Sequence, residues 1–380
     1  MTLKDRAAIF VSFKRSWLIR KMITLSYLTD RNAIARPLKP AYHQPLRRLV
    51  RPSLSTIRAC LSETSRPTLL TDPETEAEMH TVNVMINQFP APSAGAFLPD
   101  KRSFREEHRI RGYEVSPDQR ATVVTMANLL QEAAGNHAVG MWGRTDEGFA
   151  NLPSMKNVLF VMTRLQVRMY QYPKWGDIVG IETYFTEEGR LAFRRDWKVT
   201  DIATGTMIGA ATSTWVTINM DTRRLAKLPD TLRKRFLRFG PASSTHVLPP
   251  EETKKKLPDM DMPGQVQGPQ QVARRSDMDM NGHINNVTYI AWALESVPED
   301  VYHTHHLSEI EMDFKAECKA GNTVEAHCNF IVNDHFGNGG GNGSPPLQLQ
   351  LLHLLQKCDV DAGCTELVRA RTTWQPLQPQ

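Results

Sequence analysis

The chain has 380 residues, of which 41% are hydrophobic and 23% charged, so it carries enough apolar sequence for two ordinary domains. It contains no run of about 18 apolar residues, which argues against a membrane span. The net charge of +5 comes from the residues before Phe104, which include 16 Lys and Arg and 8 Asp and Glu. From Phe104 onward there are 30 Lys and Arg and 33 Asp and Glu, a net charge of −3. The basic residues therefore give no indication of nucleic-acid binding by the folded part.

The first 60 residues carry 13 basic side chains against only Asp5 and Asp30, with Ser and Thr scattered between them. An Arg- and Ser-rich, acid-poor composition is typical of an organellar transit peptide, and a disordered basic tail is the alternative. We expect residues 1–100 to be a transit peptide and disordered leader, cleaved somewhere between about 60 and 100.

The five cysteines, Cys60, Cys318, Cys328, Cys358 and Cys364, form no C-x-x-C pair. An odd count in a chain of this length argues against a disulfide scaffold and a structural zinc site, and favours a reducing compartment. We expect neither a metal nor a cofactor.

Globular patterning begins at Phe104. RIRGYEVSPDQRATVV, residues 109–124, predicts a strand, a Ser-Pro-Asp turn and the start of a helix. The helix continues over 125–143, where Met126, Leu130 and His137 share one face. Runs rich in β-branched and aromatic residues then predict four strands, at 158–170, 177–187, 190–201 and 207–219.

The same layout returns after a basic, Pro-rich segment, 221–271, which we interpret as a linker. A polar loop, 276–286, precedes an apolar helix over 287–297, and strands are predicted at 309–318, 323–332, 347–357 and 365–374. A Gly/Asn-rich insert, 335–346, has the composition of a flexible hairpin tip. The repeat predicts an α+β fold of tandem hotdog domains, each a long helix wrapped by a curved antiparallel sheet, over 104–220 and 272–376.

The polar loop permits three interpretations. Asp277, Asp279, Asn281 and Gly282 match the start of a calcium loop, but Thr288 stands where the bidentate carboxylate is required. A turn capping the next helix, with Asn285 or Asn286 as the cap, would explain one or two of these residues but not Asp279, Asn281 and His283 together. The third interpretation is acyl transfer, which needs a base, a group that orients it and a donor to the developing oxyanion.

For acyl transfer, His283 is the candidate base because imidazole titrates near neutral pH. Asp279 can fix its tautomer, and the Asn281 amide can donate to a carbonyl oxygen. The positive end of the following helix points at the same place. Glu317 and Cys318, expected at the end of the next strand, add a carboxylate and a thiol.

The stretch DMDMNGHINNVTYIAWALESVPEDV resembles the D-L-D-x-N-x-H-V-N-N motif of plant and algal acyl-ACP thioesterases. The similarity runs from about 104 to 374, including TMANLLQEAAGNHA, RRDWKVTDIATG and HLLQ with RARTTW. It implies two hotdog domains, an acyl chain held in the first, and hydrolysis of fatty acyl-ACP in the plastid stroma. The sequence is closer to the A-type, oleoyl-preferring branch, and it departs from the motif at Gly282, where the family has Gln.

By this resemblance Asp279, Asn281, His283 and Glu317 match catalytic positions. Cys318 would be the nucleophile in one scheme, with His283 as base; in the other, Glu317 and His283 activate water. We favour water, because two carboxylates near the histidine supply base capacity without a covalent intermediate. The first domain has SPDQRAT before its helix, without an amide–histidine pair, so we expect it to be catalytically silent, with His137 a packing residue.

The implied partner is the acidic acyl carrier protein, for which a local basic patch is required. The candidate docking residues are Arg223, Arg224, Lys227, Arg233, Lys234, Arg235 and Arg238, although a solvated helix face would look the same. Alternative functions are another hotdog acyl-CoA thioesterase or dehydratase, and a non-catalytic lipid-binding protein. The sequence leaves a homodimer open.

Overall fold

The computed structural model describes residues 92–142, 158–219, 221–222, 224–238, 246–280, 282–331, 348–359 and 363–377. Three sequence predictions therefore lie outside the described residues: most of the basic leader, the Gly/Asn insert and the placement of Asn281. Among the described residues, no helix combines the length and the apolar character needed to cross a membrane.

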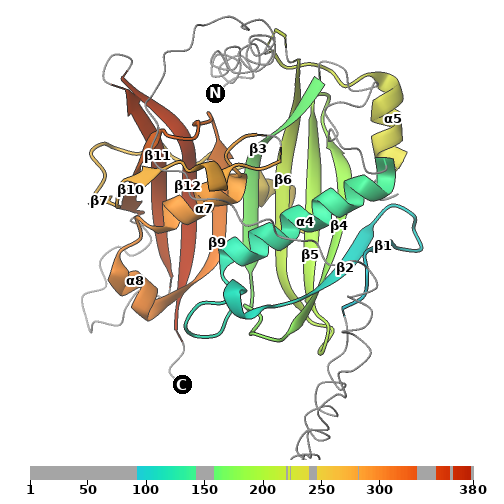
Figure 1. Cartoon of the computed structure of the whole chain (residues 1–380), viewed down its shortest axis with the longest axis horizontal. Helices are drawn as coiled ribbons and strands as arrows, with labels where there is room; N and C mark the ends of the chain where they lie inside the picture. The colour runs from blue at the N-terminus through green and yellow to red at the C-terminus, as the bar shows by residue number, and fades with distance from the viewer. Residues whose placement is uncertain are drawn as a thin grey trace, which may run out of the picture. The chain divides into compact units, whose positions relative to one another are not determined.

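The first half folds as the pattern predicts, with a long helix between its opening strands and four further strands (Figure 1). Its elements are β1 (Ala96–Phe97), β2 (Phe104–Arg109), η2 (Gly112–Glu114), α4 (Val123–Trp142), β3 (Val158–Met169), β4 (Ile178–Glu188), β5 (Ala192–Asp201) and β6 (Met207–Asn219). These strands pair antiparallel in the order β1-β2-β4-β5-β6-β3.

The second half repeats this order with a shorter helix. The connecting segment contains α5 (Asp230–Arg238), α6 (Pro250–Thr253), β7 (Val266–Gln267) and β8 (Gln271–Val272). After it come η5 (Arg275–Asp277), α7 (Asn286–Leu294), α8 (Glu299–Thr304), β9 (His305–Phe314), β10 (Thr323–Phe330), β11 (Leu349–Asp359) and β12 (Gly363–Pro376). The strands pair in the order β9-β12-β11-β10, and β10 also pairs with both β7 and β8.

The two halves join through β3 and β9, which pair antiparallel from Arg164 opposite Asp313 to Arg168 opposite Glu309. This seam makes one continuous sheet of the two halves. Each half is thus a helix lying on an antiparallel sheet, and the predicted tandem hotdog fold is confirmed.

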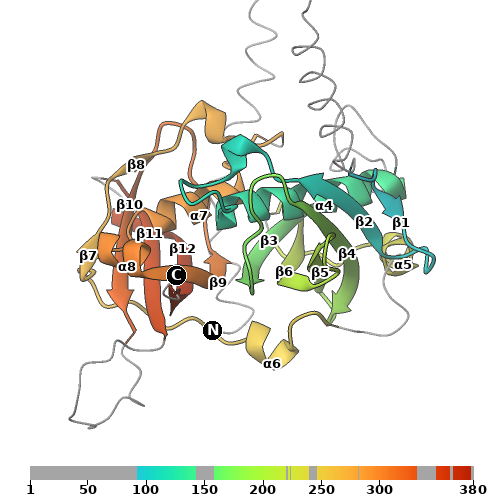
Figure 2. The ribbon, with the colours of Figure 1, turned by 90° about the horizontal axis from the view of Figure 1, so that it is seen from below.

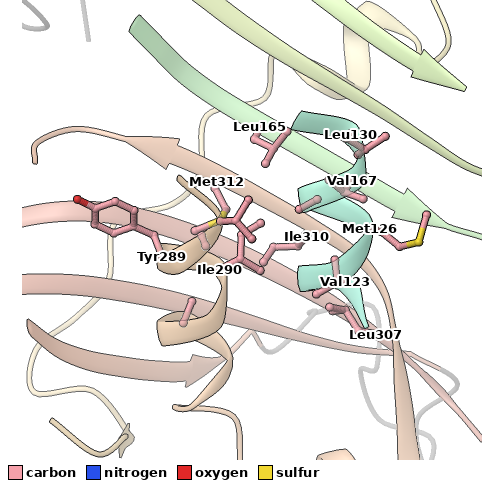
Figure 3. Packing of buried hydrophobic residues seen from close by; sticks show 14 of the residues in the cluster. Val123, Met126, Leu130, Leu165, Val167, Tyr289, Ile290, Leu307, Ile310 and Met312 are labelled. Carbon is pink, nitrogen blue, oxygen red and sulfur yellow. The ribbon is translucent and has the colours of Figure 1, made fainter. Parts of the chain in front are cut away.

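Helices α4 and α7 lie on the same face of the sheet (Figures 1 and 2). Figure 3 shows Val123 of α4 pointing toward Ile310 of β9 and Ile290 of α7, whereas Met126 and Leu130 point to the other side of α4. All five side chains are buried in one hydrophobic cluster. At about 1.5–3 kcal/mol for each large side chain removed from water, this cluster helps to hold the two halves together.

The opposite face of the sheet is polar and is covered by the connecting segment, with α6 beneath it in Figure 2. Arg168 of β3 pairs with Glu252 at 2.7 Å. Arg194 of β5, which is almost fully buried, donates to the carbonyl oxygen of Leu248 at 2.7 Å and to Thr253 Oγ1 at 3.1 Å. Successive side chains of a strand point to opposite faces of the sheet, which explains why one face is apolar and the other polar. The buried apolar residues of β3 face the helices, and its arginines face the connecting segment.

Three local predictions were wrong. The strand expected from residue 109 instead ends there, because the Arg111 backbone N–H donates to the Glu114 carboxylate at 2.8 Å and closes a 3₁₀ turn. β9 ends at Phe314, so Glu317 lies in the loop beyond the strand. Cys358 and Cys364, opposite each other on β11 and β12, form a disulfide despite the odd cysteine count.

Candidate active site

Residues 274–284, here called the catalytic loop, form a compact turn between β8 and α7. The Arg274 backbone N–H donates to Asp277 Oδ2 at 2.7 Å, closing η5. The Asp279 N–H then donates to the His283 carbonyl at 2.7 Å, and the Gly282 N–H donates to the Asp279 carbonyl at 3.0 Å. Gly282 has φ = +78°, a left-handed conformation that glycine adopts without steric cost.

The loop brings the predicted base and a carboxylate together. His283 Nδ1 lies 3.9 Å from Glu317 Oε1, and both side chains are about one-third exposed, so solvent reaches the pair. The Asp279 carboxylate accepts a hydrogen bond from the His283 backbone N–H at 3.2 Å. Three of the predicted residues therefore converge, and the structure says nothing of Asn281.

Helix α7 begins directly behind this pair. Asn285 caps it by accepting a hydrogen bond from the Val287 N–H at 3.0 Å, as one interpretation of the loop required. The backbone N–H of Asn285 donates to the Asp277 carbonyl at 2.8 Å, which connects the start of the helix to the loop. The partial positive charge of the helix N-terminus is therefore held near His283.

Cys318 has a different partner from the one that a thiol nucleophile would need. It is 4% exposed, and its Sγ lies 3.6 Å from the Tyr289 hydroxyl, which also accepts a hydrogen bond from the Cys318 N–H at 3.3 Å. Burial raises the pKa of the Cys318 thiol above its ordinary value. Burial raises the pKa of Tyr289 as well, and its contact with Cys318 adds to the shift. The thiol is thus held in its neutral form.

The sequence analysis did not single out Tyr289. Its position in an apolar helix gave no sign of a polar contact. In Figure 3 the Tyr289 side chain is directed away from α4, whereas that of its neighbour Ile290 lies on the side of α7 nearer α4.

The first domain contains a second copy of the catalytic-loop backbone. The described residues of 274–284 correspond to residues of 111–121 at a constant separation of 163, the difference between 274 and 111. Val115 bridges Ala121 as Met278 bridges Ile284. The Ser116 N–H donates to the Arg120 carbonyl at 2.9 Å, as the Asp279 N–H does to that of His283.

The side chains at the catalytic positions of the two loops differ. Ser116 and Arg120 occupy the positions of Asp279 and His283, and Gln119 adopts the positive φ (+61°) of Gly282. A guanidinium cannot serve as a base at neutral pH. This correspondence supports the expectation that the first loop is silent, and an alignment of the two loops in the sequence would have found it.

His137 is fully buried on α4, with its ring stacked on Phe104. Its Nδ1 lies 3.0 Å from a guanidinium nitrogen of Arg195, which packs over the Phe185 ring. Burial, reinforced by the charge of Arg195, lowers the pKa of His137 to about 2. His137 is therefore neutral and shielded from solvent, as expected of a packing residue.

The candidate docking residues on and before α5 are only partly described. Arg223 and the side chain of Arg235 lie outside the described part of the chain. Lys227 pairs with Asp230 at 2.8 Å. Arg233 pairs with Glu187 and donates to the carbonyl oxygens of Gly189 and Arg190 at 3.0 Å each. Arg224, Lys234 and Arg238 are exposed.

A cavity of about 260 Å³ lies at the start of α4, away from His283 and Glu317. It is lined by Tyr113, Glu114, Val115, Thr122, Val124, Thr125 and Asn128. No cluster of three or more His, Cys, Asp or Glu side chains in the described ranges is placed to hold a metal ion.

The fold and the site together define a class: a tandem hotdog in which one domain brings a histidine and a carboxylate together, while the matching loop of the other domain lacks a histidine, is a hotdog thioester hydrolase. Residues 101–236 match the family model of the acyl-ACP thioesterase N-terminal domain, and residues 265–376 match that of the C-terminal domain. The chain therefore belongs to the acyl-ACP thioesterase family.

Individual relatives agree. The chain is 38% identical to oleoyl-acyl carrier protein thioesterase 2, chloroplastic, of Arabidopsis thaliana, over 74% of this chain and 79% of the relative. It is 35% identical to a palmitoyl-acyl carrier protein thioesterase, chloroplastic, of Cuphea hookeriana, over 74% and 64%. Among solved structures, the 12:0-ACP thioesterase from Umbellularia californica aligns with a TM-score of 0.63 at 31% identity, covering 73% of this chain and 95% of that one.

Proposed function

We propose that the second domain hydrolyses long-chain fatty acyl-ACP, using Asp279, Asn281, His283 and Glu317 and an attacking water. The observation that carries this proposal is the solvent-accessible pair of His283 Nδ1 and Glu317 Oε1, 3.9 Å apart. His283 lies on the catalytic loop, whose copy in the first domain has Arg120 instead of a base.

In the proposed reaction, a water bound between His283 and Glu317 loses a proton to this pair as its oxygen attacks the thioester carbon. The negative charge that develops on the carbonyl oxygen is stabilised by the N-terminus of α7 and by the Asn281 amide. The carbon–sulfur bond then breaks, and the proton passes to the leaving thiolate of the carrier. Asp279 maintains the loop through its bond to the His283 backbone, so it acts as a positioning residue.

The acyl chain is proposed to lie in the first domain, beneath α4. The buried face of this helix offers Met126 and Leu130, and the strands beneath it offer Leu165 and Val167 (Figure 3). Methionine side chains adapt to irregular apolar shapes, which suits a flexible acyl chain. The corresponding domain assignment is 104–220 for the acyl-binding domain, 221–271 for the connection and 272–376 for the catalytic domain.

For the substrate we propose a preference for oleoyl-ACP, with palmitoyl- and stearoyl-ACP as weaker substrates. The support is the A-type character of the sequence and the higher identity to the oleoyl-named relative than to the palmitoyl-named one. Equal turnover of palmitoyl- and oleoyl-ACP would remove this preference without affecting the reaction class.

The test is free fatty acid release by the purified protein from a panel of acyl-ACP and acyl-CoA substrates, with His283→Ala alongside. We expect release from acyl-ACP that the substitution reduces by about 10²- to 10⁴-fold, the usual contribution of a general base. Release from acyl-CoA alone would indicate a different hotdog thioesterase. A folded protein that binds acyl-ACP without releasing fatty acid would instead be a lipid-binding protein.

The proposed location is the plastid stroma. The two relatives named above are chloroplastic, and the basic first 60 residues have the composition of a transit peptide. A fusion of residues 1–100 to a fluorescent protein should enter plastids, and a cytosolic signal would contradict the proposal.

A further inference from the structure

Two segments that flank the catalytic pair are held side by side at the surface of the second domain. The Ala273 N–H donates to the Asn322 carbonyl at 2.9 Å, and the Gly321 N–H donates to the Ala273 carbonyl at 2.7 Å. These bonds place the start of the catalytic loop against the turn that follows Glu317. Arg274, Arg275 and Lys319, here called the rim cations, are therefore gathered beside the site.

The rim cations are exposed, and within the described ranges none of them forms an ion pair. Several cations elsewhere in the described ranges are instead engaged by acids. In the copied loop of the first domain, Arg111 and Arg120 lie 3.9 Å from Glu114 and Asp118 respectively. Around the catalytic loop, the nearby carboxylates of Asp277 and Glu317 are only partly exposed, so the cations are the outermost charges.

Apolar side chains accompany the rim cations. Met280 is 83% exposed, Val272 53% and Met278 37%, although large hydrophobic residues usually avoid such exposure. Unbranched, polarizable methionine is common on surfaces that adapt to a partner. Free cations around exposed methionines match the composition expected for docking an acidic protein through a few apolar contacts.

We propose that the rim cations, with Met278 and Met280, form the surface that docks the acidic acyl carrier protein and delivers its thioester to His283. This inference rests on the proposed function and assigns the docking surface of the same site. Because residues 104–380 carry a net charge of −3, attraction of an acidic partner must come from a local patch such as this one.

The rim cations are better placed than the basic residues of α5 to dock the carrier protein next to His283. Helix α5 lies beside the end of α4, on the far side of the first domain from α7 in both ribbon views (Figures 1 and 2). Its Arg233 and the preceding Lys227 are already paired with acids. A carrier bound there would hold its thioester far from His283.

The test compares Arg274→Glu/Arg275→Glu/Lys319→Glu with a matched triple reversal at the α5 surface, Arg224→Glu/Lys234→Glu/Arg238→Glu. Binding of holo-acyl carrier protein is measured first, because it does not depend on hydrolysis. We expect the rim reversal to raise Kd at least tenfold and to abolish most of its salt dependence, and the α5 reversal to change Kd by less than about twofold. Unchanged binding by the rim variant, or equal weakening by the α5 variant, would overturn the assignment.

Hydrolysis of a carrier-free oleoyl thioester of N-acetylcysteamine supplies the second readout. The rim reversal should lower kcat/KM on oleoyl-ACP at least tenfold more than it lowers kcat/KM on this carrier-free substrate. Equal losses on both substrates would show that the reversal damaged the site, and would overturn the docking role. If the wild-type protein binds the carrier but hydrolyses neither substrate, the proposed function fails and the docking surface stands.

Discussion

Tyr289 and Cys318 are mutual hydrogen-bond partners: the Tyr289 hydroxyl oxygen lies 3.6 Å from Sγ and accepts the Cys318 backbone N–H at 3.3 Å. A nucleophilic cysteine requires an accessible thiolate, usually beside a cation or a histidine. Cys318 is buried, and burial raises the pKa of its thiol. The pairing supports the proposal that Cys318 helps to hold the loop that carries Glu317 and that water is the nucleophile.

Tyr289→Phe tests this supporting role. Removing the hydroxyl leaves the buried Cys318 N–H without its acceptor, which we expect to lower the free energy of unfolding by about 1–3 kcal/mol. Activity should fall by less than about tenfold, because Glu317 moves but no reacting group is lost. Denaturant titration and steady-state kinetics measure the two effects. A loss of activity as large as that of His283→Ala, with unchanged stability, would instead make Tyr289 a catalytic residue.

Glu317→Gln removes the carboxylate that faces His283 while preserving its size. If this group shares in activating water, kcat should fall by about 10² or more with little change in KM. Glu299→Gln is the matched control, since Glu299 is an exposed acid of the same domain, 89% exposed, away from the site. Comparable kcat values for the two variants would remove Glu317 from the mechanism.

His353 should make stability depend on pH. It is fully buried between Ser296 Oγ at 3.1 Å and Thr372 Oγ1 at 2.8 Å, and burial lowers its pKa from 6.5 to about 3. Between these two values the unfolded chain binds a proton that the native state does not, so stability falls as pH falls below 6.5. From pH 6.5 to 5.5 this histidine should contribute a loss of about 1 kcal/mol.

Urea titrations at the two pH values, on wild type and on His353→Gln, measure this contribution. The variant should lose less stability than wild type over the same interval, although its absolute stability is lower. An identical pH dependence for both proteins would contradict the assignment of the shift to His353. His137 should add a loss in the same direction, since burial lowers its pKa as well.

The Cys358–Cys364 disulfide closes a short loop, with a sequence separation of 6. Loop-closure entropy for such a loop gives a stabilisation of about 2 kcal/mol. Cys358→Ser/Cys364→Ser should therefore unfold at lower denaturant with unchanged kcat, and added reductant should shift wild type but not the variant. Equal stability of oxidised wild type and the double variant would show that the bond contributes nothing.

Sequence patterns identified the large elements because their signals are periodic and long. The runs at 158–170 and 207–219 became β3 and β6 with bounds within one residue, and the helical face of Met126 and Leu130 became the buried face of α4. The two-residue strands β7 and β8 are too short for any periodicity. They form because β10 offers an edge to which they pair, which is a tertiary effect.

The sequence predicted the part of the site whose residues lie close together along the chain. Asp279 and His283 fall within one loop, so their proximity followed from the chain itself. Glu317 was placed by family resemblance and is brought to His283 only by the fold. The Tyr289–Cys318 contact and the Cys358–Cys364 bond join residues whose spacing carries no motif, so neither could be read from the sequence.

The most direct measurement of the central claim is turnover of oleoyl-ACP by Cys318→Ala and His283→Ala under identical conditions. If water attacks the thioester, Cys318→Ala should keep kcat within about tenfold of wild type, whereas His283→Ala should lose about 10²- to 10⁴-fold. Complete loss of turnover in Cys318→Ala, together with an acyl group found on Cys318 of the wild type by mass spectrometry, would contradict the account and make the thiol the nucleophile.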